Sequence, residues 1–235
     1  MLLNPNLDLD RYRSLLALAG RVQIGDFLQA QWAERLHQCL RDEVPWALAL
    51  CTGGTARTIA SAEWAATNAE QRARLLGEAY QAVGANSFQF VYESYQMVRA
   101  YQEGRDPGLP LHAVLQELNG PEMLAMFRAL TGDPAIRAVS AQATCYRPGY
   151  FLTQHNDFHA EEGRAFAYVI NLSRRWHADW GGLLQFHGDQ GQVSQTLMPR
   201  WNAISMFKVP QMHSVSLVSP WAEEPRLAIT GWLRH

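Results

Sequence analysis

Residues 150–164 read YFLTQHNDFHAEEGR, and His155, Asp157 and His159 occupy every second position within this stretch. On an extended segment, the side chains of residues i and i+2 point to the same side. His155 and Asp157 are therefore expected to converge on one point, where an imidazole nitrogen and a carboxylate oxygen can bind the same metal ion. A His-x-Asp triplet is weak support by itself, so its meaning depends on the rest of the chain.

Two residues much later in the chain complete a recognisable donor set. His213 begins the strand pattern HSVSLV, and Arg226 begins the strand pattern RLAITGW. Two imidazoles and one carboxylate on one face of an octahedral ion leave three neighbouring positions free, as in the facial triad of non-haem Fe(II) oxygenases. A 2-oxo acid and O₂ can fill those positions, and the distant carboxylate of the 2-oxo acid then needs a buried cation. Arg226 suits that role, because its planar fork matches a carboxylate and burying it without an anion is costly.

His159 offers a rival third ligand, since His-x-Asp-x-His would form a metal site without His213. The turn signal EEGR (161–164) follows almost at once, so a regular strand is not expected to aim all three side chains together. The local set also leaves the HSVSLV and RLAITGW patterns unexplained. We therefore predict that His213 is the third ligand and that His159 is a rim residue.

The composition is that of an ordinary globular chain, with 235 residues, 48% hydrophobic and 18% charged. The formal net charge of -2 supplies no basic field that would attract nucleic acid or an anionic membrane. The chain shows no cationic start followed by an apolar run, and no apolar stretch of the roughly 20 residues that span a bilayer. Three cysteines without CxxC spacing are expected to be reduced packing residues. We expect a cytoplasmic protein.

The character of the chain changes near residue 135. Before it, helical patterns dominate, and we predict helices near residues 27–43 (capped by Asp26), 68–83, 111–118 and 121–132. Residues 46–59 are typical of one or two strands around a Gly-Gly turn, and residues 87–98 fit either a strand or a helix. After residue 135 we predict seven strands, at 136–146, 165–173, 182–187, 193–199, 202–209, 213–218 and 226–234. Their spacing indicates an antiparallel sandwich or barrel, with the helices packed outside it.

Several motifs of this C-terminal part resemble those of one enzyme family. They are TCYRPGYFLTQHND, GRAFAYVINL followed by WGGLLQFH, PRWNAISMFKV, and HSVSLV with RLAITGW, in consistent order over about residues 140–235. In these motifs the chain resembles the Fe(II)/2-oxoglutarate dioxygenases of the prolyl-hydroxylase type, and most of all the branch that hydroxylates a prolyl residue of a ribosomal protein. The resemblance implies an α+β fold with a double-stranded β-helix (jelly roll) core at 136–235, a mainly helical supporting region at 1–135, and one structural unit overall.

The resemblance also assigns roles to individual positions. His155, Asp157 and His213 would be the catalytic iron ligands, and Arg226 would bind the distal carboxylate of 2-oxoglutarate. Tyr146 matches a family tyrosine that hydrogen-bonds the co-substrate.

Other positions carry weaker assignments. Asn171 stands where many relatives have a second tyrosine for the same carboxylate, although an amide can still donate a hydrogen bond. Thr230 and Trp232 lie four and six residues after Arg226, so on a regular strand their side chains face the same side as that of Arg226. They are therefore expected to support the co-substrate and to line the cavity. Trp176 and Trp180 lie in a Trp-rich loop that is a candidate lid or substrate-contacting element.

The implied activity is hydroxylation of an unactivated C–H bond, prolyl 4-hydroxylase-like, with Fe(II), 2-oxoglutarate, O₂ and ascorbate as cofactors and with release of succinate and CO₂. The expected substrate is a protein or peptide, such as a component of translation. Free proline or another small metabolite is an alternative, which would need an extra charged clamp such as Arg147, Arg164 or Arg174. A non-catalytic jelly-roll binding or sensing module is a second alternative, and a zinc hydrolase is a third. The presence of all four key residues argues against the sensing module, and a hydrolase has no use for Arg226.

Overall fold

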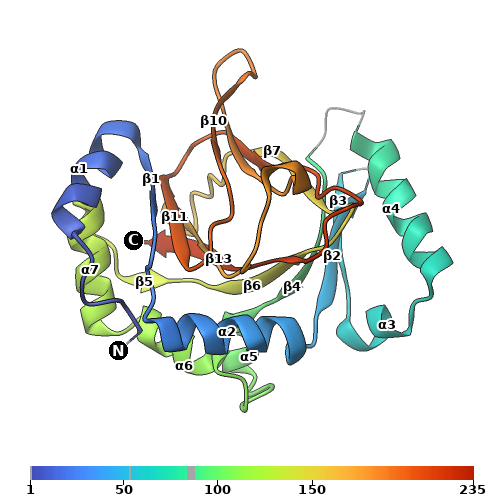
Figure 1. Ribbon diagram of the computed structural model, residues 1–235, viewed down its shortest axis with the longest axis horizontal. Coiled ribbons are helices and arrows are strands. Elements are labelled where there is room, and N and C mark those ends of the chain that lie inside the picture. Colours follow the sequence, from blue (N-terminus) through green and yellow to red (C-terminus); the bar gives the residue numbers. More distant parts are fainter. Residues whose placement is uncertain (1, 53, 84–87) are drawn as a thin grey trace.

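The computed structural model describes residues 2–52, 54–83 and 88–235 of the chain. At the centre of the molecule, an antiparallel sheet curls into a nearly closed barrel (Figure 1). The N-terminal half supplies β1 Arg21–Ile24, β2 Ala47–Thr52, β3 Thr55–Ile59 and β4 Phe90–Tyr95. The C-terminal half supplies β5 Ala138–Val139, β6 Gln142–Tyr146, β7 Phe151–His155, β8 Arg164–Asn171, β9 Leu184–His187, β10 Val193–Leu197, β11 Ala203–Lys208, β12 His213–Val215 and β13 Arg226–Arg234. This architecture confirms the predicted α+β class with a jelly-roll core.

The strand order explains why distant parts of the sequence share one interior. Neighbouring strands follow the path β1-β11-β8-β13-β6-β4-β7-β12-β9-β10, while β2 and β3 extend from β4 and β5 pairs with β13. Strand β4 pairs with both β6 and β7 and so joins the two sides of the barrel. Residues on β6, β7, β12 and β13 can therefore face the same space although they are far apart in the chain.

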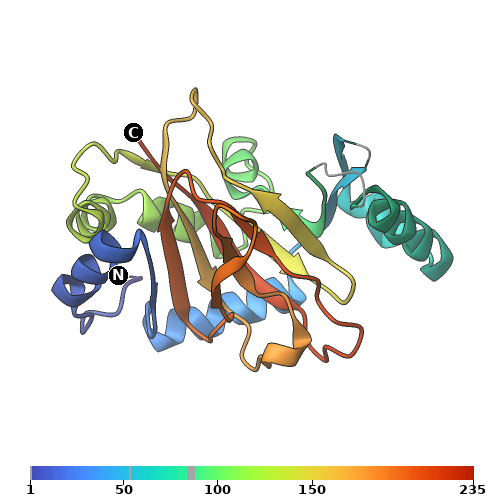
Figure 2. The same cartoon turned by 90° about the horizontal axis from the view of Figure 1, so that it is seen from above.

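Seven α-helices, all from the N-terminal half, surround the barrel within the described residues. They are α1 Leu9–Ala19, α2 Ala30–Asp42, α3 Ser61–Ala66, α4 Ala69–Val83, α5 Met97–Gln102, α6 Leu111–Leu118 and α7 Pro121–Thr131, and a short 3₁₀ turn, η1, follows at Ala178–Trp180. Helices α2, α5 and α6 run beneath the barrel in Figure 1. Figure 2 shows α1 and α7 at one end of the molecule and α3 and α4 at the other. In the described part of the chain, no helix is both long and apolar enough to cross a membrane.

Helix α2 shows how sequence periodicity produces the packing between helices and sheet. Ala33, Leu36 and Leu40 recur at helical spacing and are fully buried. They join a core cluster that also contains Phe127 of α7 and Ile229 of β13. Burial of such a side chain contributes about 1.5–3 kcal/mol, so this shared core holds the helical layer against the sheet.

The predicted ends of the helices are partly right. Pro121 occupies the first turn of α7 and Gly132 ends it in the left-handed conformation, as expected. Helix α2 starts at Ala30 rather than beside Asp26, which has a φ of 48° and does not cap it. Phe27 is fully buried in the segment before the helix, so the apolar residue that suggested an earlier start packs into the core from an irregular segment.

Several other predicted elements also differ from the structure. The ambiguous segment 87–98 forms β4 and then α5, although Ser87 lies outside the described residues, as does Gly53 of the predicted Gly-Gly turn. The predicted strand 136–146 forms two strands, β5 and β6, with Ser140 between them. The backbone oxygen of Ser140 comes so close to Gly231 that a side chain at position 231 would clash with it. Strand β7 was not among the seven predicted strands, and helix α1 and strand β1 were not predicted either. Residues 1–135 are thus helical but also add four strands to the sheet.

Candidate metal and co-substrate site

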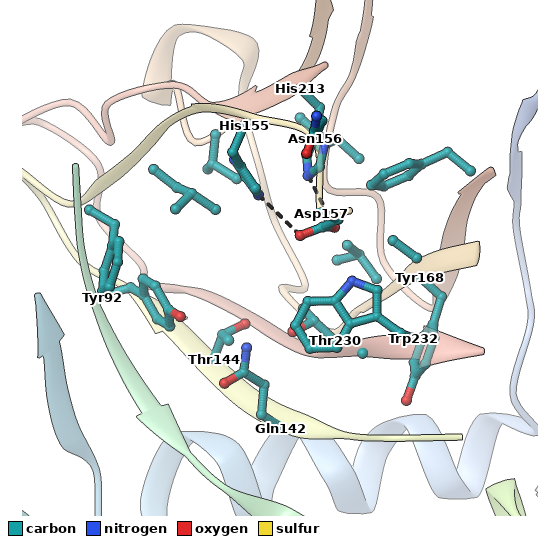
Figure 3. Close-up of a pocket in the computed structure, with 18 of the residues that line it drawn as sticks. Tyr92, Gln142, Thr144, His155, Asn156, Asp157, Tyr168, His213, Thr230 and Trp232 are labelled. Atoms are coloured by element: carbon teal, nitrogen blue, oxygen red, sulfur yellow. Dashed lines mark ion pairs between the residues drawn. The ribbon is translucent and has the colours of Figure 1, made fainter. Parts of the chain in front are cut away.

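A cavity of about 390 Å³ opens into the barrel between β4, β6, β7, β8, β12 and β13 (Figure 3). Most of the residues that the sequence singled out line it, namely His155, Asp157, His213, Arg226, Tyr146, Thr230 and Trp232. Such a concave, mainly apolar space with a few convergent polar groups is typical of a small-molecule site.

His155, Asp157 and His213 form a compact cluster at one side of the cavity. Their potential ligand atoms all lie within 4.8 Å of one another. His155 Nε2 is 3.4 Å from Asp157 Oδ1, and His213 Nε2 is 3.5 Å from Asp157 Oδ2, as the dashed lines in Figure 3 mark. Two imidazole nitrogens and one carboxylate at this spacing can bind one metal ion from one side.

The backbone brings these three side chains together at strand ends. His155 is the last residue of β7 and pairs directly with His213, the first residue of β12. Asp157 follows β7 with a φ of 61°, in the left-handed region that Asp tolerates better than most residues. The regular alternation assumed from sequence therefore ends at His155, and a turn aims the carboxylate.

Hydrogen bonds fix which ring nitrogen of each histidine faces the cluster. His155 Nδ1 lies 2.9 Å from the Thr153 carbonyl oxygen, and His213 Nδ1 lies 2.8 Å from that of Gln211. A carbonyl can only accept, so each Nδ1 carries the proton and donates it. The Nε2 of each ring is left facing Asp157, as in metal-binding histidines oriented by a second hydrogen bond.

The electrostatics favour the protonation states that metal binding needs. Burial, together with the neighbouring His155, lowers the pKa of His213 from 6.5 to about 4. Burial opposes ionisation of Asp157, but its interactions with the neighbouring His155 and His213 outweigh burial and lower the pKa of that carboxyl. At neutral pH, His213 is thus neutral and Asp157 ionised, as ligands must be.

His159 lies outside this cluster. Its side chain is exposed, and its Nε2 is 3.9 Å from Glu162 Oε1. It is not among the residues that line the cavity. The structure therefore agrees with a rim position for His159.

Arg226 lies elsewhere on the cavity wall, within β13. It pairs with Tyr146 of β6, its guanidinium lies 5.3 Å from the centre of the Tyr146 ring, and its exposure is only 3%. Its Nε and Nη1 have no hydrogen-bond partner within the described part of the chain. A buried guanidinium with two unpaired donors is costly unless an anion binds it. The chemistry of this wall therefore fits the carboxylate of a 2-oxo acid.

Asn171 does not act as the predicted second anchor in this structure. Its Nδ2 donates to the Ala203 carbonyl oxygen at 3.2 Å, within the β8–β11 pairing, and it does not line the cavity. Its Oδ1 has no partner among the described residues. The amide is shorter than the tyrosine of many relatives, so it is held by the neighbouring strand and does not reach the cavity.

The two loop tryptophans, predicted to line the substrate pocket, lie outside the cavity. Trp176 and Trp180 are each 8% exposed and pack edge-to-face at 5.3 Å. Trp176 Nε1 donates to the Gly181 carbonyl oxygen. Neither lines the cavity, because η1 folds this loop inward and both rings join the core cluster that also holds Phe151.

Three arginines were candidates for a charged clamp, and the structure separates them. Arg164 lines the cavity and stacks on Trp232, with 3.7 Å from its guanidinium carbon to the ring centre. Arg147 instead pairs with Glu93 at 2.8 Å, and Arg174 pairs with Glu34. Neither of these two lines the cavity.

The wall formed by β4 and by Phe88, which lies just before it, is the main part of the cavity that sequence reasoning left unassigned. Phe88, Phe90 and Tyr92 all line it. The signal was present, because these aromatic residues alternate along the chain as they do on one face of a strand. Since a helix was equally compatible with the segment, that face could not be assigned to the site.

Comparisons with known proteins agree with this geometry. Residues 141–234 match the family model of the 2OG-Fe(II) oxygenase superfamily. Mouse prolyl 3-hydroxylase OGFOD1 is 36% identical over 151 residues, which are 60% of this chain and 27% of that protein. The Drosophila melanogaster prolyl 3-hydroxylase sudestada1 is 30% identical over 105 residues, 40% of this chain and 19% of that protein. The chain thus spans less than a third of the length of these relatives.

Solved structures share the fold over nearly the whole chain. A Pseudomonas putida prolyl-4-hydroxylase aligns with a TM-score of 0.60 and 19% identity, covering 97% of this chain and 98% of that one. A prolyl hydroxylase from Trichoplax adhaerens, in complex with a hypoxia inducible factor peptide fragment, aligns with a TM-score of 0.60 and 17% identity, covering 98% and 94%. Proteins of this superfamily use Fe(II), 2-oxoglutarate and O₂. Residues 141–234 thus match the 2OG-Fe(II) oxygenase superfamily, and in sequence and fold the chain is similar to prolyl hydroxylases.

Proposed function

We propose that this protein is an Fe(II)- and 2-oxoglutarate-dependent dioxygenase that hydroxylates a prolyl residue of a protein or peptide, with release of succinate and CO₂. One observation carries the proposal. A His–Asp–His cluster lines the same cavity as a buried arginine, two of whose donors have no partner among the residues that the structure describes. A metal bound by the first and a 2-oxo acid bound by the second would share one space.

The chain's own residues have separable tasks in this proposal. His155, Asp157 and His213 hold Fe(II), and Arg226 binds the distal carboxylate of 2-oxoglutarate over the Tyr146 ring. When bound, Fe(II) with 2-oxoglutarate supplies the O₂ activation that a C–H hydroxylation needs. The enclosing side chains position the substrate and exclude water from the reacting atoms.

The charges around the cavity support a peptide substrate over free proline. Among the described residues that line it, Asp157 is the one carboxylate, and it faces the two histidines. The one lining arginine besides Arg226 is Arg164, which is paired with Glu162 at 2.8 Å. The ammonium group of a free amino acid would thus have no carboxylate of its own, whereas a peptidyl proline carries no charge there.

The relatives support finer points of the proposal. The matches at 30–36% identity are prolyl 3-hydroxylases, so we propose C3 of the proline ring as the hydroxylated position. The sequence pattern supports a component of translation as the substrate protein. Cys39, Cys51 and Cys145 are buried and unpaired, which fits a reducing, cytoplasmic location. Ascorbate would serve as the reductant that keeps the iron in the Fe(II) state.

Anaerobic spectroscopy tests the class of enzyme. Apo-protein mixed with Fe(II) and 2-oxoglutarate should show a weak metal-to-ligand charge-transfer band in the visible. A variant with both Asp157→Ala and Arg226→Ala should lack it. Absence of the band in the wild type, or its persistence in the double variant, would overturn the assignment.

Mass spectrometry tests the substrate. Proteins from cells with the active enzyme should contain prolyl peptides that carry one extra oxygen atom, and these should be missing when Asp157→Ala replaces the wild type. Comparison of the hydrolysed residue with 3- and 4-hydroxyproline standards then checks the position. If free proline is the sole species to gain oxygen, the peptide version of the proposal is wrong.

A further inference from the structure

A continuous row of aromatic rings follows the wall of the cavity that β4 forms. The Phe88 and Phe90 ring centres are 5.3 Å apart, and those of Phe90 and Tyr92 are 5.4 Å apart. Tyr92 stacks on Tyr146 of β6 at 5.3 Å and 17°. All four residues line the cavity, so the row is one surface of it.

The two ends of this row have different surroundings. At the outer end, Phe88 is 42% exposed and its ring lies 5.1 Å from that of His155 in the metal cluster. At the inner end, Tyr146 is 5% exposed and lies under Arg226. The inner pair of rings thus lies beside Arg226, where the proposed co-substrate would bind, and Phe88 with Phe90 is left for a molecule that approaches the metal cluster from outside.

The outer end presents more apolar surface than a closed protein surface needs. Phe158, in the loop that follows the metal-binding turn, also lines the cavity and is 66% exposed. Large exposed aromatic rings next to a reactive site are typical of surfaces that a ligand covers. Covering them removes apolar area from water, which stabilises the complex by about 25 cal/mol per Å².

The chemical character of this wall restricts what can bind there. The side chains of Phe88 and Phe90 offer neither hydrogen-bond donors nor acceptors. A prolyl residue within a peptide suits such a wall, because its nitrogen carries no hydrogen and its ring is apolar. Free proline would bring an ammonium group to the same place, where the nearby charges of Asp157 and Arg164 are already engaged.

We infer that Phe88 and Phe90 form the seat for the pyrrolidine ring of an N-acylated prolyl residue, and that they select a proline in a chain against free proline. This inference rests on the proposed function. Phe90 is the better residue to test, since its ring packs against Phe88 and Tyr92, whereas Phe88 touches the metal-cluster residue His155.

A binding experiment tests this seat without turnover. Protein loaded with Zn(II), as a redox-inert substitute for Fe(II), and with 2-oxoglutarate is titrated with N-acetyl-L-prolinamide, N-acetyl-L-alaninamide and L-proline. Saturation-transfer NMR reports the binding. The wild type should prefer N-acetyl-L-prolinamide over the other two by about tenfold or more. Phe90→Ala should weaken that binding about fivefold to tenfold, and Phe90→Leu, which keeps apolar volume but loses the ring face, should weaken it less.

Controls separate this inference from the proposed function. Trp221→Ala removes an exposed tryptophan that does not line the cavity, so it should leave binding unchanged. Failure of the wild type to bind Zn(II) and 2-oxoglutarate would count against the proposed function itself. Suppose that Zn(II) and 2-oxoglutarate bind. The assignment of Phe88 and Phe90 is then wrong if N-acetyl-L-prolinamide does not bind up to its solubility limit, or if it binds no better than L-proline. It is also wrong if N-acetyl-L-prolinamide binds to the Phe90→Ala variant as tightly as to the wild type.

Discussion

The metal-cluster side and the Arg226 side of the cavity solve opposite physical problems. At the first, nitrogen and carboxylate acceptor atoms of His155, Asp157 and His213 lie within 4.8 Å of one another, and a cation between them would bring them together. At the second, Arg226 is buried with two donors that nothing in the described chain satisfies. One side therefore suits a cation and the other an anion. The difference teaches that the two ligands of this cavity are recognised by opposite charges, a metal ion at one wall and a carboxylate at the other.

Of the predicted changes, removal of the Asp157 carboxylate should have the largest effect on metal binding. In Asp157→Ala the two histidines lose the negative charge between them, so Fe(II) affinity should fall by more than about a hundredfold and turnover should be lost. Isothermal titration with Fe(II) under anaerobic conditions measures the affinity, and circular dichroism confirms the fold. Iron binding close to that of wild type would remove Asp157 from the ligand set.

Lowering the pH should reduce the free energy of unfolding of the apo-protein through His213 in the metal cluster. The pKa of His213 is about 4 in the fold and 6.5 without it, so the unfolded chain binds the extra proton first as pH falls. The free energy of unfolding should therefore drop between pH 6.5 and about 4, by up to about 3 kcal/mol from this group. The lowered pKa of Asp157 adds a loss only below its ordinary value of 3.8.

Urea unfolding of the apo-protein across this pH range measures the effect. His213→Gln removes the titrating group and should flatten the dependence above pH 4. An equally steep dependence in the variant would place its origin elsewhere in the protein.

Arg226→Gln should weaken 2-oxoglutarate binding and leave metal binding nearly unchanged. The amide cannot form the paired, charged hydrogen bonds of a guanidinium, so the Kd for 2-oxoglutarate should rise about a hundredfold, while Fe(II) affinity stays near wild type. Arg234→Gln on the same strand is the matched control, because Arg234 does not line this cavity. Equal losses of metal and 2-oxoglutarate binding in Arg226→Gln would show that the two sides are not separable.

His159→Ala should have the smallest effect. The side chain is exposed and its ring lies near Glu162 rather than in the cluster, so Fe(II) affinity should change by less than about twofold. The same anaerobic titration checks it. A loss comparable to that of Asp157→Ala would restore the local His-x-Asp-x-His site as the metal site.

Sequence patterns predicted eight of the nine C-terminal strands, with β5 and β6 as a single strand, and singled out four residues that line one cavity, because strand alternation and residue chemistry are local properties. They were less successful where a segment's role depends on its neighbours. The segment 87–98 could be a strand or a helix until β6 and β7 were seen on its two sides. Asn171 and Trp176 have the right residue types for a site, but their side chains are used by neighbouring backbone groups.

In YFLTQHNDFHAEEGR, the sequence alone determined the donor types and predicted that His155 and Asp157 would converge, because alternation along an extended chain is a short-range rule. Only the tertiary structure could place His213 opposite His155, keep His159 out of the cluster, and bury Arg226 with two donors that no described residue satisfies. Those outcomes depend on strand pairing between distant segments and on a left-handed turn at Asp157, and neither is encoded within a few residues. The aromatic wall of β4 belongs to the same class, because a strand face becomes a binding surface only when the barrel closes around it.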